Sequence, residues 1–286
     1  MSLPRILILA IVQGFAELLP VSSSAHVIVT ERLLGLDPSA PRMTLLLVML
    51  HTGTMFAVIV YFWTQWKQAY FPSGMARKKF AEHLVIATAW TGLIGLALAK
   101  IIEKTVLSGV PHAQVEDIFS HLEIISPALA IVGVLILVAG IVEHKLAVTK
   151  LSDLNAKHAG IIGIVQGFCL PFRGFSRSGA TISAGMLLGI AKSRVEMFSF
   201  ALSVVLTPPV VARELMRAIG TLQTIGWTTI SSTILPGLAG AVFAFLAGLC
   251  ALRWLSAWLE HGRWYLFGIY CLFAAFVVIC LHRFGY

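Results

Sequence analysis

Near the start of the chain, an apolar stretch contains side chains that suit metal binding and proton transfer. Gln13 and Glu17 are four residues apart, so on a helix they share one face. Pro20 interrupts that helix, and a polar cluster follows it, formed by Ser22, Ser23, Ser24 and His26. A carboxylate and an amide oxygen suit a hard cation such as Mg²⁺. A serine hydroxyl or an imidazole can act as the nucleophile or the base of a group-transfer reaction.

A second segment repeats this design with a positive charge. Residues 165–168 (Val-Gln-Gly-Phe) repeat residues 12–15, at an offset of 153 (166 − 13 = 153). Downstream, Arg177 and Thr181 are four residues apart, and Ser176 and Ser178 stand at the expected start of a helix. Serines at a helix start cap free backbone N–H groups, and that end of a helix attracts anions. Because Arg also suits bidentate recognition of phosphate, the segment predicts a phosphate site.

The composition indicates an integral membrane protein. Of the 286 residues, 58% are hydrophobic and 12% are charged, which is about half the charge of a typical soluble domain. The net charge of +8 would suit a nucleic-acid binder, but the basic residues stand in short stretches between apolar runs. We therefore expect contacts with membrane lipids and no nucleic-acid partner. The four cysteines lack metal-ligand spacing and are expected to be inert packing residues.

Six apolar stretches are long enough to cross a hydrocarbon core of about 30 Å. They cover residues 43–63, 82–101, 124–142, 196–218, 233–254 and 264–281. Four shorter arms, over residues 7–19, 22–34, 159–170 and 176–190, reach only part-way across. Two arms joined at a break make a re-entrant hairpin. The expected fold is an all-α integral membrane protein with six transmembrane helices and two re-entrant helical hairpins, in one domain over residues 1–286.

The number of spans in each half determines the expected topology. A hairpin and three spans cross the membrane an odd number of times, so the second half starts on the opposite side. The halves, about 1–142 and 158–286, are then an inverted-topology repeat whose hairpins meet near the membrane midplane. Two Lys-rich loops are expected in the cytoplasm, one with Lys67, Arg77, Lys78 and Lys79 and the other with Lys145, Lys150 and Lys157.

Several of these residues also have a simpler interpretation. A serine run after a proline is often only a helix cap. His51 can line a cavity in the first span, but a polar residue hydrogen bonded between helices is the simpler interpretation. Pro208 and Pro209 are expected to kink the fourth span. Ionisable groups at membrane depth indicate function by default, which favours Glu17 and Arg177 as site residues.

The two segments resemble the motifs of the bacterial undecaprenyl-diphosphate phosphatases, the BacA/UppP family. The first family motif, (E/Q)xxxE followed by Pro-Val-Ser-Ser and a nearby His, is similar to residues 13–17 and 20–23 with His26. The second motif, PGxSRSxxT, is similar to residues 173–181, although Arg173 stands where the family has proline. Apolar spans of similar placement extend the resemblance over nearly the whole chain.

The resemblance implies hydrolysis of undecaprenyl diphosphate to undecaprenyl phosphate and inorganic phosphate. This reaction recycles the lipid carrier for cell-wall synthesis, and an excess of such an enzyme confers bacitracin resistance. The resemblance also implies a divalent cation, Mg²⁺ or alternatively Ca²⁺. It further implies a multi-pass protein of the bacterial cytoplasmic (inner) membrane, with an active site that opens toward the periplasm. The sequence leaves open whether the protein forms a homo-oligomer.

The residues and the resemblance together predict a role for each side chain. Gln13 and Glu17 are expected to bind the metal. The diphosphate is expected to contact a larger set, which comprises Ser22, Arg173, Ser176, Arg177, Ser178 and Thr181. The favoured nucleophile is Ser23 activated by His26, with His26 itself or water as alternatives.

Two other classes of function are open on the sequence. A transporter or flippase of a prenyl phosphate or another anionic solute would also use broken helices and an anion site. A carrier needs no nucleophile and no metal, so the residues around Glu17 favour an enzyme. A purely structural membrane protein would not place Glu and Arg at helix breaks in apolar sequence.

Overall fold

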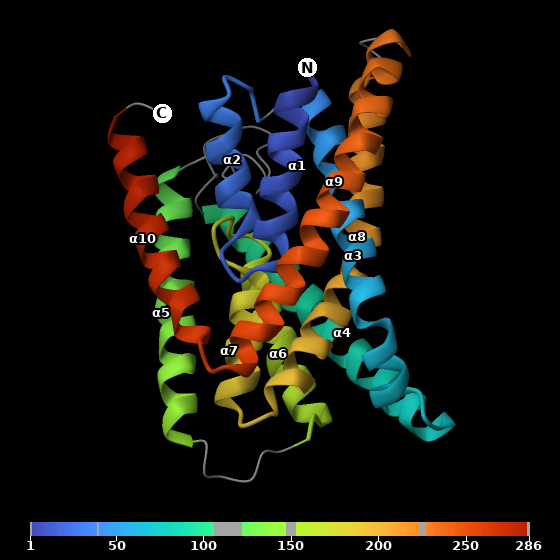
Figure 1. Cartoon of the computed structure of the whole chain (residues 1–286), viewed down its shortest axis with the longest axis vertical. Coiled ribbons are helices and arrows are strands. Elements are labelled where there is room, and N and C mark those ends of the chain that lie inside the picture. Colours follow the sequence, from blue (N-terminus) through green and yellow to red (C-terminus); the bar gives the residue numbers. More distant parts are fainter. Residues whose placement is uncertain (1, 39, 106–121, 147–152, 223–226, 285–286) are drawn as a thin grey trace. The chain divides into compact units, whose positions relative to one another are not determined.

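The computed structural model describes residues 2–38, 40–105, 122–146, 153–222 and 227–284. Within these ranges the chain forms ten helices and no β-strand, which confirms the all-α fold (Figure 1). Proline and glycine stand at the breaks of the helical hairpins, at Pro20 and at Gly174. Elsewhere the long apolar runs form helices, because a helix satisfies its own backbone hydrogen bonds.

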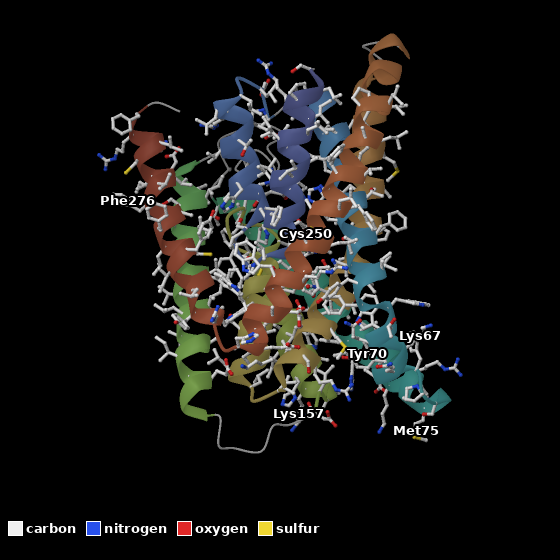
Figure 2. The ribbon with its side chains drawn as sticks, viewed as in Figure 1. Lys67, Tyr70, Met75, Lys157, Cys250 and Phe276 are labelled. Carbon is white, nitrogen blue, oxygen red and sulfur yellow. The ribbon has the colours of Figure 1, made fainter. Side chains whose placement is uncertain are left out.

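Six helices in the described ranges are long and apolar enough to cross a membrane, as predicted. Their bounds are Pro41–Tyr70 (α3), Gly74–Thr105 (α4), Leu122–Leu146 (α5), Lys192–Leu222 (α8), Trp227–Glu260 (α9) and Trp264–Arg283 (α10). Each contains one predicted span and extends beyond it. Pro208 and Pro209, which were expected to kink the fourth span, both lie inside α8. The outward apolar side chains, such as Phe276 of α10 (Figure 2), are the surface that lipid would cover.

The extra helical length corrects the expected position of several basic residues. Lys67 lies in the last turn of α3, and Arg77 lies in the first turns of α4, so neither belongs to a long loop. The connection between these helices is only residues 71–73. Figure 2 shows Lys67, Tyr70 and Met75 around it. The helices continue past the apolar core, so their charged ends take the place of a loop. Lys150 of the second Lys-rich stretch lies outside the described residues.

Four shorter helices match the predicted arms. They are Leu3–Leu18 (α1), Ser23–Leu33 (α2), Ala156–Cys169 (α6) and Arg177–Leu187 (α7). The 16 residues of α1 span about 24 Å and the 11 residues of α2 about 16 Å. Both lengths fall short of a 30 Å hydrocarbon core, which agrees with the prediction that these segments do not cross it alone.

The chain divides into two compact units. Unit 1 comprises residues 1–19, 23–63 and 203–255, and unit 2 comprises residues 20–22, 64–202 and 256–286. Both units draw on both halves of the sequence, so the units are not the two predicted repeats. The candidate residues divide in the same way, because Glu17 and Ser23 belong to unit 1 and Arg177 belongs to unit 2.

In unit 1, the hairpin α1–α2 packs as a pair (Figure 1). Its core is a cluster of buried apolar side chains, which comprises Ile6, Leu9, Ala10, Val27, Met43, Leu46, Leu50 and Ala244. A Cβ atom on Gly14 would lie 2.7 Å from the carbonyl oxygen of Ala244, so glycine lets α1 approach the backbone of α9 closely. This contact holds α1 against α9 at Gly14, which lies between the polar residues Gln13 and Glu17 in the sequence.

In unit 2, α5 pairs with α10 and α4 pairs with α6 (Figure 1). Gly163 of α6 lies against Ala87 of α4, and the Thr91 hydroxyl oxygen lies 3.0 Å from the carbonyl oxygen of Gly163. The Gln166 side chain is fully buried, and its Nε2 donates to the Thr91 hydroxyl at 3.2 Å. Close backbone packing and buried polar bonds therefore hold α6, which leads into the second polar segment.

The α4–α6 contact predicts a stability effect. Gly163→Ala is expected to lower the melting temperature in detergent by several degrees, because the new Cβ atom would lie 2.7 Å from Ala87 Cα. Overpacking of this kind costs about 1–3 kcal/mol. The control is Gly92→Ala in α4, where a Cβ atom meets nothing within 4 Å and alanine favours the helix. Thermal unfolding that is equal in the two variants would contradict the close contact.

Candidate active site

Glu17 is the centre of the polar group in unit 1. It lies in the last turns of α1, and its side chain is 13% exposed. Its Oε2 accepts hydrogen bonds from Ser23 Oγ at 2.6 Å and from Gln13 Nε2 at 3.1 Å. The predicted i, i+4 pairing of Gln13 with Glu17 is therefore present, and the serine across the helix break contacts the same oxygen. A hydroxyl this close to a carboxylate forms a strong, charge-assisted hydrogen bond.

His51 also faces this carboxylate. Its Nε2 lies 3.5 Å from Glu17 Oε2, while its Nδ1 lies 2.8 Å from the carbonyl oxygen of Leu47 on its own helix. Because a carbonyl only accepts, Nδ1 carries a proton and Nε2 is the atom presented to Glu17. The simpler interpretation from sequence was a hydrogen bond between helices, but the Leu47 bond lies within α3, and the contact that joins two helices is the one with Glu17. The approach to Glu17 depends on how α3 packs beside α1.

A pocket in unit 1 opens beside Glu17 and His51. Polar and apolar side chains from three helices line it, namely Glu17, Leu18, His51, Thr54, Met55, Val58, Ser203, Val204 and Thr207. The sequence analysis did not predict that the α8 residues Ser203 and Thr207 line the site. Their signal is a spacing of four inside an apolar span, which places both hydroxyls on one helix face.

The break between α1 and α2 positions Ser23. Ser22 has a φ of 69°, a left-handed conformation that non-glycine residues rarely adopt. The chain turns there, and α2 begins at Ser23, so the serine hydroxyl returns to Glu17. His26 lies one turn further along α2 and is half-buried. Its backbone carbonyl accepts a hydrogen bond from the Thr30 hydroxyl at 2.7 Å.

In unit 2, the second polar segment opens α7 as predicted. Ser176 is the N-cap, and its Oγ accepts a hydrogen bond from the backbone N–H of Gly179 at 3.2 Å. Arg177 is the first residue of the helix and is half-buried. Gly174 precedes it with a φ of 95°, and a Cβ atom there would lie 3.0 Å from Ile125 Cα. The cap and this tight turn place Arg177 at the positive end of the helix, which favours an anion.

The other predicted residues of this segment differ in their exposure. Arg173 is half-buried, whereas Ser178 is buried. Thr181 is fully buried, and its Oγ1 lies 2.8 Å from the carbonyl oxygen of Arg177 and 2.6 Å from Ser199 Oγ. The Thr181 hydroxyl therefore contacts groups of unit 2 itself.

Each of the two segments carries one charge at a position where the other segment has a neutral residue. At the offset of 153, Glu17 corresponds to Leu170 (17 + 153 = 170) and Arg177 corresponds to Ser24 (177 − 153 = 24). The glutamines at 13 and 166 are retained, yet Gln13 donates to Glu17 whereas Gln166 donates to Thr91. One segment thus supplies a carboxylate and the other a guanidinium.

Comparison with known proteins gives a match over nearly the whole chain. A family model described as bacitracin resistance protein BacA matches residues 6–277. The chain belongs to the BacA family. With six helices suited to span a membrane in its described part, this member of the family is a multi-pass membrane protein.

Relatives of the chain are similar over nearly their full length. Undecaprenyl-diphosphatase 2 of Acinetobacter baylyi is 54% identical over 284 residues, which cover 98% of this chain and 98% of that protein. Undecaprenyl-diphosphatase 1 of Burkholderia pseudomallei is 33% identical over 292 residues, which cover 98% and 96%. Undecaprenyl-diphosphatase 2 of Burkholderia ambifaria is 32% identical over 285 residues, which cover 96% and 95%.

Proposed function

We infer that this chain is an undecaprenyl-diphosphate phosphatase, which hydrolyses undecaprenyl diphosphate to undecaprenyl phosphate and inorganic phosphate. The observation that carries this conclusion is the 54% identity to the Acinetobacter baylyi enzyme over 98% of both chains. The reaction returns the lipid carrier to cell-wall synthesis, and resistance to bacitracin is associated with the family.

The membrane arrangement that we propose follows from the sequence. The pairs α1–α2 and α6–α7 are re-entrant hairpins of an inverted repeat, in the cytoplasmic membrane of a bacterium. The short lengths of these four helices support this arrangement, because none reaches across a hydrocarbon core. The site would open toward the periplasm, and the carboxylate and guanidinium segments would take different roles in the reaction. Their complementary chemistry supports this division of roles.

Arg177 and the start of α7 are the proposed clamp for the diphosphate. The guanidinium and the positive end of the helix both favour phosphate oxygens. The Ser176 hydroxyl accepts the Gly179 bond and keeps its own proton for donation to a phosphate oxygen. In phosphoryl transfer such groups act by positioning the substrate and stabilising developing charge. Arg173 adds a second positive charge four residues before the start of α7.

Ser23 is the proposed nucleophile, and its contact with Glu17 supports that carboxylate as the proton acceptor. As Ser23 Oγ bonds to the terminal phosphorus, its proton passes to Glu17 Oε2, 2.6 Å away. The bond from that phosphorus to the bridging oxygen breaks, and undecaprenyl phosphate leaves. Water then attacks the phosphoserine, Glu17 returns the proton to Ser23 Oγ as the phosphorus–Oγ bond breaks, and inorganic phosphate departs with the two protons of the water. The sequence favoured His26, one turn beyond Ser23, as this base. His26 as base or nucleophile, and water as nucleophile, are the alternatives.

The donor set around Glu17 fits a divalent cation that takes some of its ligands from the protein and the others from the substrate. Among the described residues, no group of three or more His, Cys, Asp and Glu side chains could hold a metal ion by itself. Glu17 and Gln13 instead offer a carboxylate and an amide oxygen, and Mg²⁺ commonly binds one or two carboxylates together with substrate phosphates. A bound cation would neutralise charge on the phosphate oxygens. Ca²⁺ is the alternative cation.

Phosphate release from undecaprenyl diphosphate by the purified protein in detergent tests the function. We expect turnover with Mg²⁺ and a loss of at least about a hundredfold after chelation, because charge stabilisation of this kind contributes several kcal/mol. Adding Mg²⁺ back should restore the rate. Turnover that is unchanged in chelator would contradict the cation. No turnover by well-folded protein would contradict the phosphatase and favour transport of a lipid phosphate.

A further inference from the structure

We propose that Ser199 of α8 is a positioning residue for Arg177 and that it acts through Thr181. The inference rests on the proposed function, in which Arg177 contacts the diphosphate. Ser199, Thr181 and Arg177 all belong to unit 2. Ser199 lies 18 residues beyond the second motif, in a helix that the motif does not include.

The hydrogen-bond directions follow from the number of protons. The Thr181 hydroxyl has one proton and three oxygen neighbours, which are the carbonyls of Arg177 at 2.8 Å and Ser178 at 3.4 Å and the Ser199 hydroxyl at 2.6 Å. The carbonyl oxygens can only accept. Thr181 donates to the Arg177 carbonyl, and with its proton placed there the 2.6 Å contact is a hydrogen bond only if Ser199 donates to Thr181. The result is a buried chain from α8 through Thr181 to the backbone of Arg177.

Burial gives this chain its effect. Thr181 is 0% exposed and Ser199 is 3% exposed, so solvent has little access to replace a lost partner. A buried hydroxyl without its partner pays the full cost of desolvation. The Ser176 cap holds the same helix turn by its bond to Gly179. The backbone turn that carries Arg177 is thus held by two hydrogen bonds from side chains.

This geometry changes the role expected for Thr181. Its proton is used on the Arg177 carbonyl, so it is not a donor to the phosphate. The i, i+4 spacing of Arg177 and Thr181 suggested that both side chains contact the phosphate. Instead, Arg177 is the phosphate contact, and the Thr181 hydroxyl holds the Arg177 backbone. Ser199 holds the Thr181 hydroxyl in the orientation that this support requires.

The test compares Ser199→Ala with a matched serine elsewhere in unit 2. Ser126→Ala is the control, because Ser126 is also buried and donates one hydrogen bond, at 2.8 Å, to the carbonyl of Ala275. We expect Ser199→Ala to lower kcat/KM for undecaprenyl diphosphate about tenfold and to weaken binding of inorganic pyrophosphate by a similar factor. The control should change each by less than about twofold, with a similar melting temperature. A Ser199→Ala variant that behaves like the control overturns the inference.

A double-mutant cycle tests whether the effect passes through Thr181. Thr181→Val removes the hydroxyl, so adding Ser199→Ala should reduce pyrophosphate binding no further. Multiplied losses in the double variant would overturn the inference. Thr181→Ser keeps the hydroxyl and should retain most of the wild-type affinity. If Ser199→Ala does not fold, Ser199→Cys takes its place in the cycle, since a thiol is a weaker donor of similar size.

Pyrophosphate binding separates the two possible failures. If wild-type protein binds pyrophosphate through Arg177 but releases no phosphate from the lipid, the phosphatase fails and the effect of Ser199 is still measured. If Arg177→Ala binds pyrophosphate as well as wild type, the clamp itself fails and the inference falls with it.

Discussion

Glu17→Gln is expected to lower kcat/KM for undecaprenyl diphosphate by about a thousandfold, the range of a lost general base. The amide keeps the size of the side chain and can still accept the Ser23 hydrogen bond, which the carboxylate accepts at 2.6 Å. It cannot take the proton of Ser23, and it removes the negative charge that would hold a divalent cation. The measurement is steady-state release of phosphate from the lipid by detergent-purified protein.

The control for this prediction is Glu260→Gln, which changes an exposed carboxylate at the end of α9. It should leave kcat/KM within about twofold of wild type, as expected for a surface substitution. A direct measurement of Mn²⁺ binding divides the two roles of Glu17. If Glu17→Gln loses activity but still binds Mn²⁺, Glu17 acts in proton transfer alone. Activity retained in Glu17→Gln would remove Glu17 from the mechanism.

Arg177→Ala is expected to reduce kcat/KM by about a hundredfold to a thousandfold, because a preorganised charge at a transferred phosphoryl group contributes roughly 3–4 kcal/mol. Arg177→Lys should recover only part of this loss. Lysine keeps the charge but lacks the planar fork that binds two phosphate oxygens at once. Competitive inhibition by inorganic pyrophosphate should weaken in parallel with catalysis in both variants.

Arg283→Ala serves as the control for Arg177, because Arg283 is exposed at the last residue of α10. Its pyrophosphate inhibition constant should equal that of wild type. An Arg177→Lys variant with full activity would show that charge alone is needed, and the bidentate clamp would be wrong. Equal losses in the Arg177 and Arg283 variants would indicate a general effect of net charge.

The local part of the fold was predictable from the sequence. The six long helices and the four short ones lie where hydropathy and the Pro20 break indicated, because both signals are properties of neighbouring residues. Their ends were less predictable. The α3 helix continues to Tyr70 because a helix retains its backbone hydrogen bonds after its apolar run has ended.

Pairs of site residues close in sequence were also predictable. Gln13 and Glu17 meet because they are one helical turn apart, and Ser176 caps α7 because serine at a helix start accepts a backbone N–H. The Ser23 bond to Glu17 was not predictable in this way. It depends on the left-handed φ of Ser22, which turns the chain back on itself.

The sequence by itself determined the class of protein, the helices and the two charged segments, because composition and helical spacing act over short distances. Only the tertiary structure placed His51 beside Glu17, and Ser203 and Thr207 around the same pocket. It likewise paired Thr181 with Ser199 and showed that the Thr181 hydroxyl supports Arg177. Each of these side-chain contacts joins two different helices, so it depends on how the helices pack and not on residue spacing along one helix.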